Sequence, residues 1–247
     1  MSNPIRFTAL AAAMCLAACA DTDSEIAELE TATTDGEAAA LATAIDPGDF
    51  ADLELGAKIV GPRGPEVKTS LANSEAIMAD ITSYVACPAG MDECVPADAP
   101  EGTIYTYVHT VYPGEDMDAS TGAGDGPDDA HVENAEAFMM TQPAHGFTGT
   151  AGFSKAEAVA AAGESVDVIL TCGDDGGLTW VVNAGDGGNQ WEDAEPLTFY
   201  WQSTLPPAGP VSAYAIRANG VSGEGEGPLP AASETARNAC TGSSTEG

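Results

Sequence analysis

Positive charge is scarce in this chain of 247 residues. Only seven lysines and arginines accompany 39 aspartates and glutamates, so the formal net charge at pH 7 is −32. The acidic residues are spread along the whole sequence and create a field that repels nucleic acid and anionic headgroups. The composition therefore excludes nucleic acid as a partner and predicts a strongly hydrated acidic surface.

Recognisable catalytic motifs are also missing. The chain has no G-x-S-x-G nucleophile elbow, no P-loop and no dinucleotide-binding fingerprint. Of its three histidines, His109 falls on a predicted strand beside two tyrosines, where we expect a hydrogen-bonded structural role, and His145 falls in a predicted loop. These gaps favour a protein without enzymatic activity. Because 39 acidic residues offer many carboxylate pairs, a carboxylate-based hydrolase stays open as the alternative.

The apolar stretch near the N-terminus is too short to cross a bilayer. It runs from Phe7 to Ala18 after a single charge at Arg6, whereas a spanning helix needs roughly 20 residues. A charged start followed by a short apolar core is typical of a secretory signal peptide. The sequence therefore predicts export, with residues 1–18 removed.

The end of this stretch, Leu16-Ala17-Ala18-Cys19, resembles the lipobox of bacterial lipoproteins. The resemblance implies that Cys19 is the lipidation site and the mature N-terminus, and that the lipid anchor makes the membrane a partner. In that family an Asp directly after the cysteine retains the protein in the inner membrane, but here Ala20 follows. The resemblance thus implies a cell-envelope protein anchored in the outer membrane. The other interpretation is an ordinary thiol at Cys19 in a signal peptide cut elsewhere.

Four further cysteines suggest two disulfides in an oxidising compartment. Cys87, Cys94, Cys172 and Cys240 allow three pairings. The compact sequence "CPAGMDEC" favours Cys87–Cys94, which leaves Cys172–Cys240. A four-thiolate zinc site is the rival interpretation, but two C-x-x-C pairs are lacking.

Composition divides the mature chain into three parts. Residues 19–50 mix Ala, Thr, Asp and Glu with few large apolar side chains, which predicts a disordered acidic tether. Residues 51–230 are expected to form the folded domain. Residues 231–247 are expected to be a C-terminal tail tied down by a disulfide.

Residues 51–230 carry a two-residue hydrophobic period typical of half-buried strands. Gly, Pro and Asp separate the runs, so we predict a mainly β fold, an antiparallel β-sandwich. The seven predicted strands lie within 53–60, 77–87, 103–111, 165–172, 177–184, 197–203 and 211–218.

The sequence "YAIRANGVSGEGEGP", Tyr214 to Pro228, taken as the final strand, resembles the penultimate-strand signature of fibronectin type III modules. In that module a Tyr begins a strand that ends near Ala-x-x-Gly, and Trp180 could be its early-strand tryptophan. The resemblance covers about 50 residues and implies an immunoglobulin- or fibronectin-like sandwich.

One short helix is predicted near 155–162. Ser154 is a suitable N-cap, Glu157 is the expected capping-box partner three residues on, and Gly163 ends the segment. Because the helix is short and mostly alanine, we expect it to depend on docking through Val159.

An acidic insertion between Pro113 and Glu136 is the candidate metal site. Its carboxylates could offer oxygens to Ca²⁺, and His131 lies among them, but EF-hand spacing is absent. A solvated loop, a calcium site and a transition-metal site through His131 are the three interpretations, and calcium is the cofactor for which the sequence offers candidate ligands. The candidate ligands are Asp116, Asp118, Asp125, Asp128 and Asp129. A weaker acidic cluster comprises Asp186, Glu192 and Asp193.

Aromatic residues on predicted strands give the candidate binding surface. If Tyr105, Tyr107 and Tyr200 face outward, they could bind sugar rings of a polysaccharide or an envelope protein; otherwise they fill the core. The sequence therefore predicts a lipid-anchored cell-envelope protein with a non-enzymatic β-sandwich for binding or structure. A calcium-dependent or carboxylate-based envelope hydrolase is the alternative.

Overall fold

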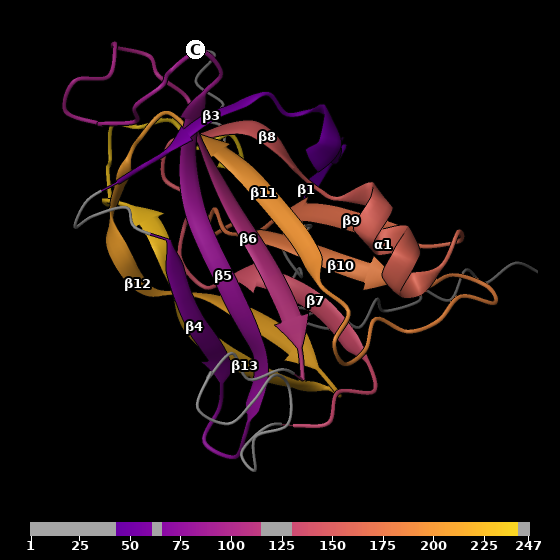
Figure 1. Cartoon of the computed structure of the whole chain (residues 1–247). Helices are drawn as coiled ribbons and strands as arrows, with labels where there is room; N and C mark the ends of the chain where they lie inside the picture. Colours follow the sequence, from indigo (N-terminus) through magenta and orange to yellow (C-terminus); the bar gives the residue numbers. More distant parts are fainter. Residues whose placement is uncertain (1–42, 61–65, 115–129, 242–247) are drawn as a thin grey trace, which may run out of the picture. The chain divides into compact units, whose positions relative to one another are not determined.

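The computed structural model describes residues 43–60, 66–114 and 130–241. Within these residues the protein is mainly β, with one large sheet and a single short α-helix (Figure 1), so the predicted sandwich-like class is confirmed. The helices are the 3₁₀ turn η1 (Phe50–Asp52) and α1 (Lys155–Ala162). The strands are β1 (Thr43–Ile45), β2 (Gly48–Asp49), β3 (Leu55–Lys58), β4 (Val67–Ala72), β5 (Ile77–Pro88), β6 (Tyr105–Pro113), β7 (Ala135–Met140), β8 (Phe147–Phe153), β9 (Asp167–Cys172), β10 (Leu178–Asn183), β11 (Leu197–Ser203), β12 (Pro207–Ala218) and β13 (Val221–Pro230).

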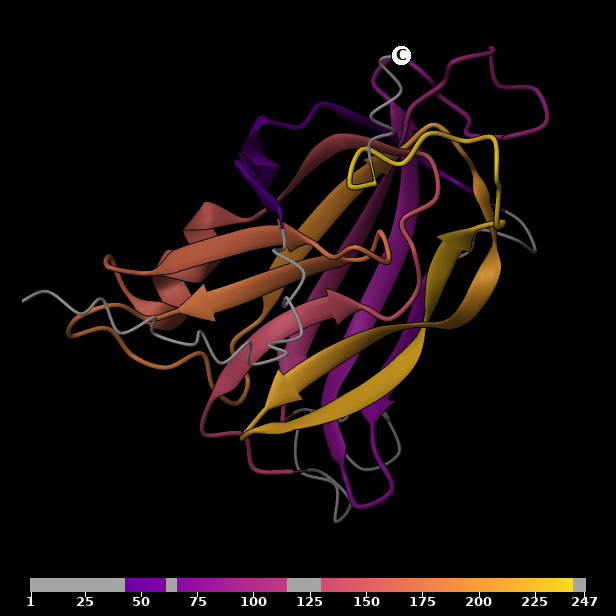
Figure 2. The ribbon, with the colours of Figure 1, turned by 180° about the vertical axis from the view of Figure 1, so that it is seen from behind.

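The sheet folds over on itself to make two layers. Its strand order is β1-β9-β10-β7-β12-β13-β4-β5-β6-β11-β8-β2, with β3 beside β5. Strands far apart in this order touch: the rings of Phe138 (β7) and Phe199 (β11) lie 5.0 Å apart, and the indole of Trp180 (β10) donates to the Gly152 carbonyl (β8) at 3.0 Å. Figure 2 shows the layer of β9, β10, β7, β12 and β13 in front of the layer of β5 and β6.

A row of glycines forms the corner between the two layers. On β13, Gly223 and Gly225 face the backbone of β4; a Cβ at Gly225 would lie 2.4 Å from the Ser70 carbonyl oxygen. Gly227 packs on the ring of Tyr214, where a Cβ would come within 2.6 Å. The close approach that glycine permits lets the sheet turn without a break. We call Gly223, Gly225 and Gly227 the glycine corner.

The opposite side of the sandwich is a seam bridged by residues 43–49. β1 pairs antiparallel with β9 of one layer, and β2 pairs parallel with β8 of the other. Between them Asp46-Pro47 redirects the chain, because proline has no N–H for a ladder. The predicted tether boundary at residue 50 is therefore wrong, since residues 43–50 belong to the folded domain.

Helix α1 matches the predicted range, but it docks differently. The Ser154 hydroxyl accepts from the Glu157 amide at 3.3 Å, as expected of an N-cap. Glu157 does not close a capping box; its carboxylate accepts from the Thr198 amide of β11 at 2.7 Å and so ties the helix to the sheet. The expected docking through Val159 is also wrong, because Val159 is 37% exposed and the buried face consists of alanines.

Both disulfides have the predicted pairing, Cys87–Cys94 and Cys172–Cys240. The second one holds the C-terminal segment against β9. The expectation that Tyr214 to Pro228 form a single strand is wrong. This sequence lies in the β12–β13 hairpin, whose turn places Asn219 and Gly220 at positive φ. No helix within the described ranges is long and apolar enough to span a membrane.

Candidate functional site

The three tyrosines predicted to bind ligands lie in the interior. Tyr105 is 4% exposed, Tyr107 0% and Tyr200 2%. Tyr107 stacks on Trp201 at 4.3 Å between ring centroids, and its hydroxyl donates to the Leu205 carbonyl at 3.0 Å. The expected aromatic platform is therefore wrong, and these rings fill the sandwich.

Tyr200 is buried for a reason that the sequence did not reveal. It lies on the outer face of β11, under residues 48–50, the end of the predicted tether. Its ring is 6.1 Å from that of Phe50, and a Cβ at Gly48 would lie 2.2 Å from its hydroxyl oxygen. Residues 48–50 thus cover a face that would otherwise be open, and burial raises the pKa of Tyr200.

The proposed calcium ligands, from Asp116 to Asp129, lie outside the described residues. Among the residues that are described, no group of three or more His, Cys, Asp or Glu side chains is arranged to hold a metal ion. The weaker cluster shows a different role: Asp193 accepts from the Val132 amide at 2.6 Å and pairs with the His131 ring. The hydrogen bond to Asp193 raises the pKa of His131. Asp193 thus links the residues before β7 to the loop between β10 and β11.

A serine–histidine pair lies between the layers, but it is closed to substrate. The Ser83 hydroxyl is 2.9 Å from His109 Nδ1, and both side chains are fully buried. Within the described part of the chain, Nε2 of His109 has no hydrogen-bond partner. Burial lowers the pKa of His109 to about 3, so the ring is neutral. His109 is thus buried and hydrogen-bonded, as expected.

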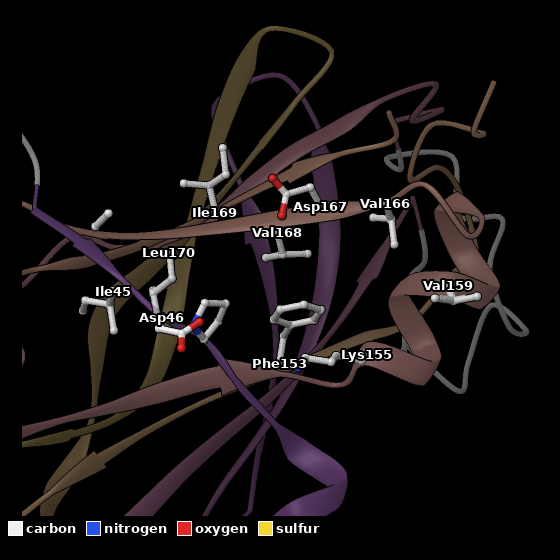
Figure 3. A pocket seen from close by; sticks show the side chains of 12 residues that line it. Ile45, Asp46, Phe153, Lys155, Val159, Val166, Asp167, Val168, Ile169 and Leu170 are labelled. Atoms are coloured by element: carbon white, nitrogen blue, oxygen red, sulfur yellow. The ribbon is translucent and has the colours of Figure 1, made fainter. Parts of the chain in front are cut away.

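The seam of the sandwich contains a groove that sequence reasoning missed. Its volume is about 570 Å³, within the range of small-molecule sites. Figure 3 shows its walls: the bridging segment 44–47, Phe153 at the end of β8, the first turns of α1, and residues 166–170 leading into and along β9. Three separate parts of the chain, within residues 44–47, 153–159 and 166–170, thus converge on one hollow.

The alternation of β9 sets the surface of the groove. Val168 and Leu170 are buried, whereas Asp167 and Ile169 are exposed, as expected of a strand with one face inward. In Figure 3 Val168 and Leu170 point toward Phe153 and Ile45. β1 pairs with β9 only from Leu170 onward, because the chain turns away at Asp46-Pro47. The groove lies beside the stretch of β9 that β1 leaves uncovered.

Three charged side chains stand at this apolar groove. Lys155 lies on the α1 side, Asp46 on the bridging segment and Asp167 on β9. The ammonium group of Lys155 makes no ion pair within the described residues. In a chain of net charge −32, an unpaired cation beside apolar side chains marks a place where an anionic group can be accepted.

Comparisons with protein-family models, curated proteins and solved structures find no match for this chain. The function proposed for the groove therefore rests on its own residues.

Proposed function

We propose that this protein is a lipid-anchored cell-envelope protein whose β-sandwich is a non-enzymatic binding module for an amphiphile. The groove at the seam carries the proposal, because it combines an apolar interior with one unpaired ammonium group. The lipobox-like sequence ending at Cys19 supports the anchor and the outer-membrane location.

The geometry of the groove suits a ligand with an apolar body and one anionic group. Ile45, Val159 and Val166 line the groove and are at least partly exposed, so they offer the apolar contacts, and burial of alkyl groups there supplies about 0.8 kcal/mol per methylene. Lys155 can pair with the anion at the exposed end. Asp46 and Asp167 disfavour a second negative charge, so the ligand class is a monoanion.

Metabolic labelling with a palmitate analogue tests the anchor. A second cysteine, Cys15, lies within the predicted signal peptide four residues before Cys19 and provides a matched control. We expect Cys19→Ala to lose the label and to leave the membrane fraction, and Cys15→Ala to keep both. Equal labelling of the Cys19→Ala chain would overturn the anchor.

Binding of the dye 8-anilinonaphthalene-1-sulfonate, a monoanion with an apolar body, tests the groove. It is measured by dye fluorescence with the Cys19→Ala chain at about 0.15 M salt, where exposed charges are screened beyond about 8 Å. Val159→Asp places a charge in the groove, at a site that is 37% exposed. Val221→Asp is the control: it places the same charge on β13, outside the groove, at a site that is 46% exposed. We expect at least a tenfold loss of affinity only for Val159→Asp. An equal effect of both variants, or of neither, contradicts the proposal.

A further inference from the structure

A second hollow lies on the outer face of the layer that contains β7, β10 and β12. Its volume is about 410 Å³ and its walls are mainly polar. They come from the start of β7, the end of β10 with the loop that follows, and β12, all of which face the viewer in Figure 2. The hollow is separate from the groove at the seam, since the two share no lining residue.

Strand register explains why the hollow exists. Phe138, Trp180 and Ile216 are paired neighbours in the core, so the residues next to them point to the opposite face. These residues are Ala137, Val181 and Arg217, again paired across the three strands. The small side chain of Ala137 leaves room between Arg217 and Val181.

Arg217 is an unusual residue at this place. It is one of seven cations in the chain, it is exposed, and it forms no ion pair within the described residues. Glu136 also lines the hollow, and one of its carboxylate oxygens accepts from the Gly220 amide at 3.0 Å. The guanidinium fork of Arg217 therefore remains available, and such forks bind carboxylates in a bidentate manner.

Polar groups of both kinds surround Arg217. The amides of Asn134, Asn183 and Gln190 can each donate and accept, and Glu136 can accept. Val181 and Ala137 form a small apolar floor. A ligand that satisfies this set needs a carboxylate for the fork, several hydroxyls for the amides and the glutamate, and a C–H face for the floor.

We infer that this hollow binds a uronate, the carboxylated sugar unit of acidic polysaccharides. A uronate has one carboxylate, hydroxyls that donate as well as accept, and an apolar ring face. A phosphate group matches the site less well: it has no C–H face for Val181 and Ala137, and as a dianion it adds more negative charge to a protein of net charge −32. The inference is independent of the proposed groove function.

Titration of the full chain with D-glucuronate, followed by ligand-observed NMR, tests the inference. The chain is kept in a detergent without sugar groups at about 0.15 M salt. We expect a dissociation constant in the millimolar range for glucuronate and at least tenfold weaker binding of glucose, which lacks the carboxylate. Inorganic phosphate is the competing probe, and we expect it to bind at least tenfold more weakly than glucuronate.

Three variants locate the binding. Arg217→Ala should weaken glucuronate binding at least tenfold, and Arg217→Lys, which keeps the charge but loses the fork, should recover only part of it. Arg237→Ala removes the same charge from the C-terminal segment, outside the hollow, and should change nothing. No detectable binding, equal binding of phosphate, or an unchanged affinity of Arg217→Ala would each overturn the inference. An unchanged melting temperature shows that each variant is folded.

Discussion

The sandwich is closed on its two sides by different means. At the glycine corner, β13 and β4 are in direct backbone contact, because Gly223 and Gly225 carry no side chain to hold them apart. At the seam, a bridging segment of seven residues, 43–49, joins the layers through strands of only three and two residues. The corner leaves little space between its strands, whereas the seam leaves a groove of about 570 Å³.

This difference separates what holds the fold from what can bind. A row of glycines fixes the distance between two backbones, so any added atom is resisted. A short bridge interrupted by Pro47 pairs with only part of the neighbouring strand, so the stretch of β9 before Leu170 stays unpaired by β1 beside α1. The seam is the side where a ligand can be accommodated without separating the layers.

The seam should depend most on its covalent tie. Cys172, which pairs in register with Thr43 of β1, is joined to Cys240 across 68 residues. Removing a disulfide that closes a loop of that length lowers the free energy of unfolding by about 4 kcal/mol in the chain-entropy model. We expect the double variant Cys172→Ala, Cys240→Ala to lose about this amount in urea unfolding followed by tryptophan fluorescence.

The other disulfide provides the control for this experiment. Cys87–Cys94 closes only seven residues, for which the same model gives about 2 kcal/mol. We expect its double alanine variant to lose about half as much. Equal losses of stability in the two double variants would show that Cys172–Cys240 matters no more to the fold than the local disulfide Cys87–Cys94.

The glycine corner should fail after the addition of a single methyl group. A Cβ at Gly225 would lie 2.4 Å from the Ser70 carbonyl oxygen and 2.9 Å from Cδ2 of Leu71. Since backbone must move to accept it, we expect Gly225→Ala to lose about 3 kcal/mol, the upper end of overpacking costs. Glu224→Ala, next to it on the exposed face, should change stability by less than about 0.5 kcal/mol. A small loss in Gly225→Ala would contradict the role of the corner.

Local signals made part of the fold predictable. The helix over 155–162 follows from Ser154 and Gly163, which act within one turn. The pairing Cys87–Cys94 follows from a short loop. Strands with clear alternation, such as β9 and β10, also lie where the period placed them.

What was missed depends on contacts between distant segments. The sequence from Tyr214 to Pro228 reads as one strand, and the separate strand β13 is missed because its glycines are needed only where β4 approaches. Residues 43–49 read as a tether because they bury little by themselves and gain order by pairing with β9 and β8. The groove and the burial of Tyr200 both follow from that segment, so neither could be predicted without its position. An early hint was Pro47, which stops a strand after Ile45.

The smallest expected effect is a dependence of folding stability on pH, and it comes from His109 in the interior beside the glycine corner. His109 lies 4.2 Å from the ring of Tyr214, which packs on Gly227, and burial holds the pKa of His109 at about 3. An unfolded histidine has a pKa of about 6.5, so the folded state is favoured above pH 6.5 and loses this advantage as the pH falls toward 3. At pH 5.0 the unfolded chain has bound a proton that the folded chain has not, which costs about 2 kcal/mol at roughly 1.4 kcal/mol per pH unit.

Urea unfolding at pH 7.5 and 5.0 measures this dependence as a difference between chains, because the many carboxylates also titrate. His109→Gln stays neutral at both pH values, so its stability should fall by about 2 kcal/mol less than that of the parent chain over this range. His145→Gln, in the loop before β8, is the matched control and should follow the parent chain. NMR of the His109 ring gives an independent test: protonation between pH 5 and 7 would mean that water reaches the interior at the corner. The contrast between a dry corner and an open seam would then be lost.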